Sequence, residues 1–583
     1  MGDKATEWLF VGYSYKYYLE LKQKMGPSSL EKSFYGHVNE YLDTYRQKYL
    51  ENINRISINN HLPSFHFTRV AENNTMCHNL FMDYCYYSSI EALSDQLRGS
   101  LIFVESEPLW RVLKDLLDDN IHVKLCGSKR MSTIWQKKIN RIRNVLGFIK
   151  RVIKVKILTV LYRKSKLEPI TPVTLLYLFP NDDSFTSDLK LRDSYLGGFI
   201  PHLINKNKTF FYLINPGYPC KRTISIIKWL KQAKVNGVLL EEYISLSDII
   251  RAIILTKTLT KVDVSSIPEG NCFLSPLIKQ YLEKETQGGE FAYNYLHYCF
   301  INNLKKYGIR ISDYIDVYEG QIMERILRYS VRKAFPEAKS IGFAHAAPSK
   351  NHIAMFSSLK AGKIDLKPDL LLCTGDAYRD FFIKNGFKEN QTLSIGDLRG
   401  YNNNLQSKPI VDKQVDHKIV LVALPLAVND TQELFWKVIK AYNNTKYTVK
   451  IYKHPMMQLE ILYEMLEGAI PENINIADEP TASGMDQCDL VVVTGSTVSV
   501  NALGRGLPVI SVERSIGLTF EPMDWFDSPI IYCETPEEII RATNKIFSMS
   551  KKELETNRIE SINIARKCLD PQVNHFAIEQ CLS

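Results

Sequence analysis

The chain has 583 residues, 45% of them hydrophobic and 23% charged, which excludes a disordered protein and predicts at least two sizeable domains. Its 73 Lys and Arg residues exceed its 64 Asp and Glu residues, giving a formal net charge of +9. Thirteen of the cations lie between Lys129 and Lys166, a stretch without Asp or Glu, so the rest of the chain is net negative by four. This division argues against nucleic acid as a partner, because nucleic-acid-binding proteins spread basic residues over a whole face.

The chain carries no sign of secretion or membrane insertion. No stretch reaches the roughly 18 uninterrupted apolar residues of a transmembrane helix, and the N-terminus lacks a charged-then-apolar signal pattern. The eleven cysteines include no Cys-x-x-Cys pair, which indicates reduced thiols without a zinc site. We therefore expect a cytoplasmic protein.

Short apolar runs alternate with helix-length segments along the whole chain. This alternation predicts an α/β fold with parallel sheets of the doubly wound type. The predicted strands are 8–11, 101–104, 122–125, 173–178, 210–214, 238–240, 341–343, 370–373, 393–395, 419–424, 449–452, 490–493, 509–512 and 530–532.

A polar segment from Tyr401 to His417 predicts a domain boundary, because it begins Tyr-Asn-Asn-Asn and contains Pro409. Residues 1–401 are interpreted as a large N-terminal α/β domain and residues 417–583 as a smaller C-terminal one. A final helix over about Lys551 to Cys568 is expected to pack back across the boundary.

The basic segment has the periodicity of an amphipathic helix. Apolar residues recur at three- and four-residue steps, at Trp135, Ile139, Ile142, Leu146, Ile149, Ile153, Ile157 and Val160. The cations fall mostly off that stripe, at Lys137, Lys138, Arg141, Arg143, Lys150, Arg151 and Lys154. Such a helix suits an anionic membrane surface. The alternative is a helix packed on the core with a solvated basic face.

Three motifs follow predicted strands, where ligands bind in open α/β sheets. In the first, the strand 449–452 runs into Lys453-His454-Pro455, and the proline ends the strand and leaves the imidazole at the sheet edge. There it can donate to a phosphate oxygen, although a histidine in a turn can also be merely solvated.

In the second, the strand 490–493 opens into Thr494-Gly495-Ser496-Thr497 and a helix. Gly495 permits a tight turn, and the hydroxyls of Ser496 and Thr497 fit either a helix cap or an anion site. In the third, Gly342-Phe343-Ala344-His345 leads through small residues to Lys350. His345 is either a base, an oxyanion donor or a structural histidine.

The three motifs together resemble glycosyltransferases of GT-B architecture that use cytidine-nucleotide donors. A strand ending in His-Pro and a later hydroxyl-rich turn resemble bacterial sialyltransferases and Kdo transferases. In those enzymes the equivalents of His454 and Ser496/Thr497 bind the CMP phosphate.

The segment from His345 to Lys350 also resembles the His-Gly-Thr-Pro-Leu-Lys element of CDP-glycerol glycerophosphotransferases of teichoic-acid synthesis. The overall pattern is similar to surface-carbohydrate biosynthesis proteins, through Tyr318-Glu319-Gly320-Gln321, Gly342 to His345, and Asp397-Leu398-Arg399-Gly400-Tyr401. The resemblance covers about Asp316 to Val512. Tyr318 departs from the sialyltransferase acidic motif, in which two acids precede the glycine, and Asn501 stands where many retaining enzymes have a ribose-binding glutamate.

The resemblance implies a GT-B-like fold and an inverting, metal-independent transferase. It would move a sugar, such as a sialic-acid-like or Kdo residue, from a CMP donor to a surface glycan or glycolipid. Glu319, or otherwise His345, would take the acceptor proton, although Glu319 also suits a purely electrostatic role before a helix. The expected donor-binding residues are His454, Pro455, Gly495, Ser496, Thr497, Lys350 and Arg399.

No metal or other cofactor is expected, and Asp118-Asp119 and Asp182-Asp183 are interpreted as turn residues. The basic segment 129–166 is expected to hold the enzyme at the inner face of the cell membrane. Two alternatives remain open: a CDP-alditol phosphotransferase of teichoic-acid type with His345 as base, and an inactive GT-B-like scaffold that recruits other enzymes to the membrane.

Overall fold

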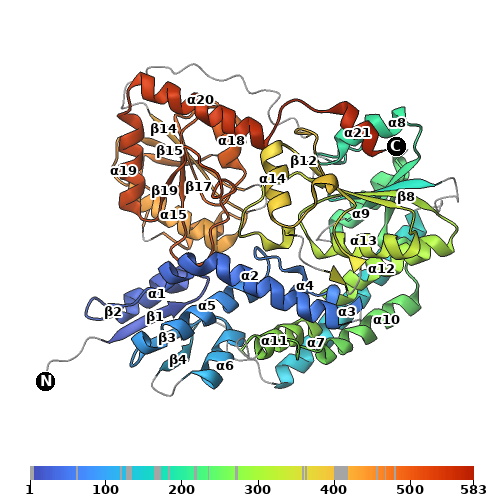
Figure 1. Cartoon of the computed structure of the whole chain (residues 1–583), viewed down its shortest axis with the longest axis horizontal. Coiled ribbons are helices and arrows are strands. Elements are labelled where there is room, and N and C mark those ends of the chain that lie inside the picture. Colours follow the sequence, from blue (N-terminus) through green and yellow to red (C-terminus); the bar gives the residue numbers. More distant parts are fainter. Residues whose placement is uncertain are drawn as a thin grey trace.

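The computed structural model contains three separate parallel β-sheets and a small antiparallel hairpin. Figure 1 shows the C-terminal sheet at the upper left, a small N-terminal sheet at the lower left and a large N-terminal sheet at the right. The structure describes residues 6–60, 63–117, 121–126, 134–162, 172–180, 184–215, 220–233, 235–268, 273–356, 360–361, 364–398, 418–454, 457–466, 468–477 and 481–582. The predicted boundary 401–417 lies outside these residues.

The C-terminal sheet has the order β16-β15-β14-β17-β18-β19, all parallel. Its strands are β14 (Ile419–Ala423), β15 (Thr448–Tyr452), β16 (Ile474–Ala477), β17 (Leu490–Val493), β18 (Val509–Val512) and β19 (Ile531–Cys533). In sequence terms this is the order 3-2-1-4-5-6 of dinucleotide-binding folds, which reverses between β14 and β17. The sequence predicted five of the six strands and missed β16.

The large N-terminal sheet has the order β13-β12-β9-β8-β5-β6-β7. Its strands are β5 (Val173–Leu178), β6 (Phe210–Ile214), β7 (Gly237–Leu239), β8 (Ile311–Val317), β9 (Lys339–Ala344), β12 (Leu370–Cys373) and β13 (Thr392–Ser394). Numbered along the chain, this is the order 3-2-1-4-5-6 with β13 added as a seventh strand at one edge. The order reverses between β5 and β8. The predicted α/β class, with two doubly wound Rossmann-like units, is confirmed by these orders.

Helices cover both faces of the two large sheets. One face of the N-terminal sheet packs against α10 (Leu246–Thr256), α12 (Glu290–Lys306) and α13 (Ile322–Ala334), and the other against α8 (Ile200–Asn205) and α9 (Cys220–Gln232). The C-terminal sheet lies between one layer formed by α15 (Val428–Tyr442) and α19 (Pro536–Phe547) and a second formed by α17 (Thr481–Met485), α18 (Val498–Gly504) and α20 (Lys551–Cys568).

The central strand β8 was not predicted, because charged residues interrupt its apolar pattern. Asp313 and Asp316 lie in it, both buried. The Nζ of Lys208 pairs with the Asp313 carboxylate at 2.8 Å, and the guanidinium of Arg328 pairs with Asp316 at 2.9 Å. Buried carboxylates need partners such as these cations, and a search for apolar runs therefore misses a strand that contains them.

The range predicted as one N-terminal domain contains a third sheet of order β2-β1-β3-β4. Its strands are β1 (Glu7–Val11), β2 (Leu30–Glu31), β3 (Leu101–Val104) and β4 (His122–Leu125), with helices α1 (Tyr15–Met25), α2 (Tyr35–Asn59), α5 (Leu80–Ala92) and α6 (Glu107–Leu116). Trp8, Phe10 and Tyr15 pack in one cluster with the C-terminal core, and other residues of this region pack with Tyr318 and Ala344. The small sheet therefore bridges both large units.

The chain returns to the N-terminal unit at its end, as predicted for the final helix. The Thr374 hydroxyl donates to the Cys568 carbonyl at the end of α20 at 3.0 Å. Beyond it, Ile578 of α21 (His575–Cys581) and the following Leu582 are buried in the core of the large N-terminal sheet. Figure 1 shows α21 and the C-terminus beside α8.

Replacing Arg328 tests the buried charges under β8. Arg328 also pairs with Glu324 at 3.0 Å, and all three side chains are at most 1% exposed. Arg328→Met should lower the free energy of unfolding by about 3–5 kcal/mol, because it leaves two buried carboxylates without a counter-charge. Urea denaturation measures this loss. The exposed Arg541 on α19 is the matched control, and Arg541→Met should change stability by less than about 0.5 kcal/mol. Equal effects of the two changes would contradict this account.

Candidate functional site

The strand-order reversal of the large N-terminal sheet brings two predicted residues together. Glu319 lies two residues after β8, at the reversal, and His345 directly follows the neighbouring β9. The Nε2 of His345 lies 3.2 Å from Oε1 of Glu319. The two residues proposed as alternative bases are thus one hydrogen-bonded pair at the carboxyl edge of the sheet.

The surroundings keep the Glu319 carboxyl ionised. Burial acts to raise its pKa, but the hydrogen bond and charge of His345 outweigh that effect and lower the pKa to about 2. Gln321 donates its amide to the second carboxylate oxygen. The Glu319 side chain is 29% exposed and that of His345 only 6%, so Glu319 is the member that a substrate can reach.

His345 is held from its other side by the loop after β5. The Tyr195 ring meets the imidazole edge-on at 4.5 Å between centroids. The Nδ1 of His345 and Oδ2 of Asp193 are both buried and have no hydrogen-bond partner among the described residues. Burial raises the pKa of Asp193, and the charge of His345 opposes that rise. This histidine therefore acts on the pKa values of two carboxyl groups.

The turn that carries Glu319 is fixed by the buried ion cluster behind it. The backbone N–H groups of Glu319 and Gly320 donate to the Glu324 carboxylate at 3.2 and 3.1 Å. Gly320 has φ +72°, and a Cβ there would lie 2.1 Å from the Ala354 carbonyl oxygen. Glu324 in turn pairs with Arg328. The sequence pattern contained no signal for this support, since Glu324 resembles any acid in the first turn of a helix.

The C-terminal reversal brings the other predicted motifs to one edge. In the register, Ala423 at the end of β14 pairs with Tyr452 on one side and Val493 on the other. His454 follows Tyr452 by two residues and Gly495 follows Val493 by two. The two motifs therefore flank the end of β14, where open α/β sheets bind ligands.

The turn after β17 is compact. Gly495 has φ +51° and packs on Phe520, whose backbone N would lie 3.2 Å from a Cβ at that position. The Ser496 hydroxyl accepts the N–H of Val498, the first residue of α18, at 3.2 Å. Thr497 makes no capping hydrogen bond with its side chain. The Ser496 hydroxyl therefore caps the start of α18, and the Thr497 hydroxyl does not.

Two predicted donor residues lie outside the described part of the chain. These are Pro455 and Arg399. His454 itself is half-buried, and burial together with the neighbouring Lys453 lowers its pKa. Its imidazole is therefore neutral at pH 7, when it can donate one N–H to an anion without carrying a full charge.

Segment 519–526 links the two reversals. The Asn351 amide donates to the Thr519 carbonyl at 2.7 Å, and the Trp525 indole N–H donates to the Pro348 carbonyl at 3.3 Å. The adjacent Phe520 packs on Gly495. Hence the loop after His345 and the turn after β17 share one connecting segment. Lys350 lies near Glu513 and Asp524. Burial raises the pKa of both carboxyl groups, and the charge of Lys350 opposes that rise.

Glu521, in the same segment, is a site-supporting residue that the sequence did not reveal. It is 1% exposed and accepts hydrogen bonds from Ser499 of α18 at 2.6 Å and Ser511 of β18 at 2.8 Å. Burial raises its pKa to about 7. Glu521 therefore ties the helix behind the Gly495 turn to the neighbouring strand.

The small N-terminal sheet also reverses its order, between β1 and β3, but its own side chains fill that position. The Glu105 carboxylate accepts the N–H groups of Tyr13 and Ser14 at 2.7 and 2.9 Å. An anion would need the same N–H groups. This third reversal is thus occupied by the protein itself.

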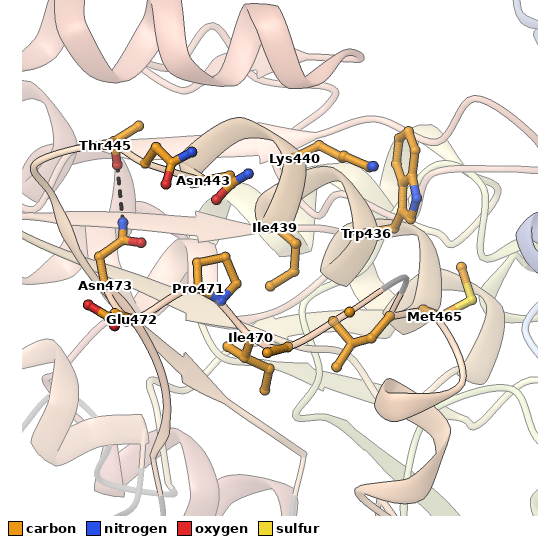
Figure 2. Close-up of a pocket in the computed structure, with 14 residues that line it drawn as sticks. Trp436, Ile439, Lys440, Asn443, Thr445, Met465, Ile470, Pro471, Glu472 and Asn473 are labelled. Atoms are coloured by element: carbon orange, nitrogen blue, oxygen red, sulfur yellow. Dashed lines mark hydrogen bonds between the residues drawn. The ribbon is translucent and has the colours of Figure 1, made fainter.

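Two cavities in the described part of the chain lie away from these motifs. One, of about 710 Å³, lies between the end of α15 and the loop before β16, and Figure 2 shows Asn473 donating there to Thr445. The second, of about 410 Å³, lies near Lys418, Pro508 and Ile531, at the amino ends of the strands. Both occupy the edge opposite His454, so neither contains a predicted site residue.

The predicted basic helix exists as α7 (Ile134–Tyr162). Among its predicted membrane residues, Arg143 and Lys150 are exposed and Arg141 is half-buried, while the side chains of Trp135, Lys137 and Lys138 lie outside the described part. Arg151 departs from the prediction, because its guanidinium stacks on the Tyr293 ring at 4.7 Å. Within the described residues no cluster of acids, histidines or cysteines has the make-up of a metal site, and no helix is long and apolar enough to cross a membrane.

Comparisons with known proteins find only a weak structural likeness. No protein-family model and no curated protein matches the sequence. Solved structures with some likeness include UDP-GlcNAc 2-epimerase from Neisseria meningitidis bound to UDP-GlcNAc, at 8% identity and a TM-score of 0.38 over 70% of this chain and 99% of that one. The calicheamicin glycosyltransferase CalG4 has 11% identity and a TM-score of 0.37 over 70% and 98%. The wall teichoic acid polymerase TagF has 12% identity and a TM-score of 0.33, over 76% of this chain and 96% of that one. Likeness this weak carries no argument about function.

Replacing Gly320 tests whether the Glu319 turn depends on its close approach to Ala354. Gly320→Ala should lower the free energy of unfolding by at least about 1 kcal/mol, because it combines a left-handed φ with a backbone clash. Urea denaturation measures the loss. Gly36, near the start of α2 with open space around it, is the matched control, and Gly36→Ala should leave stability unchanged or slightly higher. A Gly320→Ala protein as stable as the control would show that the turn is not constrained.

Proposed function

We propose that the protein is an inverting glycosyltransferase that uses a nucleotide-activated sugar. The observation that carries this proposal is the Glu319–His345 pair at the reversal of one sheet, joined through segment 519–526 to the Gly495 turn at the reversal of the other. One edge offers an ionised carboxylate, and the other offers donors for an anion. Transfer of a sugar from a phosphate leaving group requires both.

Glu319 is the proposed base. The acceptor hydroxyl oxygen attacks the anomeric carbon, the bond from that carbon to the donor phosphate breaks, and the hydroxyl proton passes to the Glu319 carboxylate. Because its pKa is about 2, this carboxylate is ionised throughout the neutral range. His345 holds Oε1 in place.

The leaving phosphate is the proposed ligand of the C-terminal motifs. His454 would donate its N–H to a phosphate oxygen, and the Thr497 hydroxyl makes no cap bond and can do the same. Such donors stabilise charge that develops in the transition state and require no metal. The compact turn at Gly495 lets a ligand approach the backbone closely.

The donor is proposed to be a CMP-linked acidic ketose, and the acceptor a surface glycan or glycolipid at the cytoplasmic face of the membrane. The support for CMP is the resemblance of His454-Pro455 and Ser496/Thr497 to the motifs of CMP-dependent transferases. The support for the membrane is the cationic segment 129–166.

A CDP-alditol phosphotransferase is the second candidate. The observation that favours it is the position of His345 at the sheet edge with Lys350 on the same loop, in the pattern of the teichoic-acid enzymes. Both candidates release CMP, but only the second transfers a phosphate into the product. Thermal-shift screening of CMP, CDP, UDP and GDP followed by phosphate analysis of the product separates them.

The Glu319–His345 pair should govern turnover and its pH dependence. Glu319→Gln should lower kcat about 10²–10⁴-fold, because a neutral amide cannot take the proton. In His345→Ala, loss of the partner that lowers the Glu319 pKa lets burial raise it from about 2 towards or above the usual 4.5. The acid limb of kcat/KM should therefore move to higher pH. CMP release against pH measures both effects. An unmoved acid limb in His345→Ala, or full turnover in Glu319→Gln, would contradict the assignment.

His454 should govern donor binding. His454→Ala should weaken CMP binding about 10–100-fold, because a hydrogen bond to a charged group contributes about 1.5–3 kcal/mol. Calorimetric titration with CMP measures the loss. His122, exposed at the end of the small sheet, is the matched control, and His122→Ala should bind CMP as the wild type does. Equal binding by both variants would place the phosphate elsewhere.

A further inference from the structure

The helix α7 packs on the protein with one face and leaves a second apolar face exposed. Its inner face is formed by Phe148, Val152, Val155 and Thr159, all at most 7% exposed. These residues recur at steps of three and four, so they lie on one side of the helix. These buried residues differ from the apolar stripe identified in the sequence, which runs from Trp135 to Val160.

The exposed face of α7 carries that second stripe. Five of its members are more than half exposed: Ile139 (53%), Ile142 (60%), Leu146 (59%), Ile157 (52%) and Val160 (72%). On a helix of 3.6 residues per turn they lie opposite Phe148 and Val152. A helix packed on the core with a solvated basic face, the alternative for this segment, would expose cations there but not a row of isoleucines.

A second helix shows the same feature. Leu246, Ile250 and Ile254 of α10 are 63%, 58% and 56% exposed and follow one another at steps of four. Ile249 and Ala252 form the inner face and are buried. The length and periodicity of α10 are ordinary for a surface helix, so its exposed stripe is visible only in the folded structure.

The two exposed stripes are neighbours. The Nζ of Lys156 on α7 donates to the Ile244 carbonyl at 2.5 Å, two residues before α10 begins. Val160 lies one turn after Lys156 and so adjoins this contact. Both helices lie at the lower right of Figure 1, away from the C-terminal sheet. The later part of α7 and the start of α10 therefore lie side by side, and their two exposed stripes together are here called the α7–α10 surface.

Charge decides which occupant fits the α7–α10 surface. On α7, Arg143, Lys150 and Lys154 are exposed and there is no acid, and on and after α10 Arg251 and Lys257 are exposed. The single acid within α10, Asp248, is buried and accepts hydrogen bonds from Ser245 and Asn303. Apolar rows flanked by cations match the acyl chains and headgroups of an anionic bilayer.

We propose that α7 and α10 together form a membrane-docking surface that lies in the headgroup region of an anionic lipid bilayer. The inference deepens the proposed membrane location by adding Leu246, Ile250 and Ile254 to the cationic helix. It does not depend on the identity of the sugar donor. It orients the protein with the large N-terminal sheet towards the membrane and the C-terminal sheet away from it.

Vesicle co-sedimentation of the full chain tests the α7–α10 surface. The probe is vesicles of phosphatidylcholine with about 30% phosphatidylserine. Ile250→Glu should weaken binding at least about tenfold, because it removes an inserted side chain and adds a charge that anionic lipid repels. Ile559 on α20 is an equally exposed isoleucine at 51%, and Ile559→Glu should bind as the wild type does.

Lys150→Ala should weaken binding about fivefold, since one surface cation contributes about 1 kcal/mol, and purely zwitterionic vesicles should bind less than anionic ones. A CMP thermal shift measured on each variant should stay at the wild-type value, so loss of docking and loss of donor binding are distinguished. Wild-type vesicle binding by Ile250→Glu would overturn the inference. The inference would also be overturned if the wild-type protein did not bind vesicles and instead formed a dimer that Ile250→Glu dissociates.

Discussion

The reversal of strand order within each large sheet is the constraint on which the rest of the structure depends. Where the order reverses, the loops leaving two neighbouring strands turn to opposite faces and leave the carboxyl edge open between them. Glu319 follows one strand at such a point, and Gly495 follows another. Segment 519–526 then contacts the loops of both sheets. The chemistry proposed for the protein needs two edges that act on one substrate, and this arrangement supplies them.

Buried charge gives the N-terminal edge its rigidity. Arg328 pairs with the carboxylates of Asp316 and Glu324, and all three side chains are at most 1% exposed. Glu324 also accepts backbone N–H groups of the Glu319 turn. Such clusters contribute little net stability compared with apolar packing, because desolvation offsets the attraction. Their value here is positional, since the carboxylate accepts N–H groups that would otherwise be buried without partners. In the C-terminal unit, Glu521 joins α18 to β18 by accepting hydrogen bonds from Ser499 and Ser511.

Chemistry and docking lie on different parts of the molecule. The candidate groups lie at sheet edges between the two large units, whereas the α7–α10 surface lies on helices that cover the N-terminal unit. The proposed docking through α7 and α10 would leave the C-terminal unit free of the bilayer. In the proposed reaction, the nucleotide donor would bind at the edge of the C-terminal unit and the acceptor would come from the bilayer.

The sequence by itself determined the α/β class, nearly all strands of the C-terminal sheet and the motifs after them, because apolar runs and turn residues are local signals. Only the tertiary structure decided the rest. It revealed β8, whose buried Asp313 and Asp316 depend on Lys208 and Arg328 from distant segments. It separated the small N-terminal sheet and joined Glu319 to His345. It also decided which stripe of α7 is buried. Each of these depends on partners far apart in the chain, and periodicity carries no information about such partners.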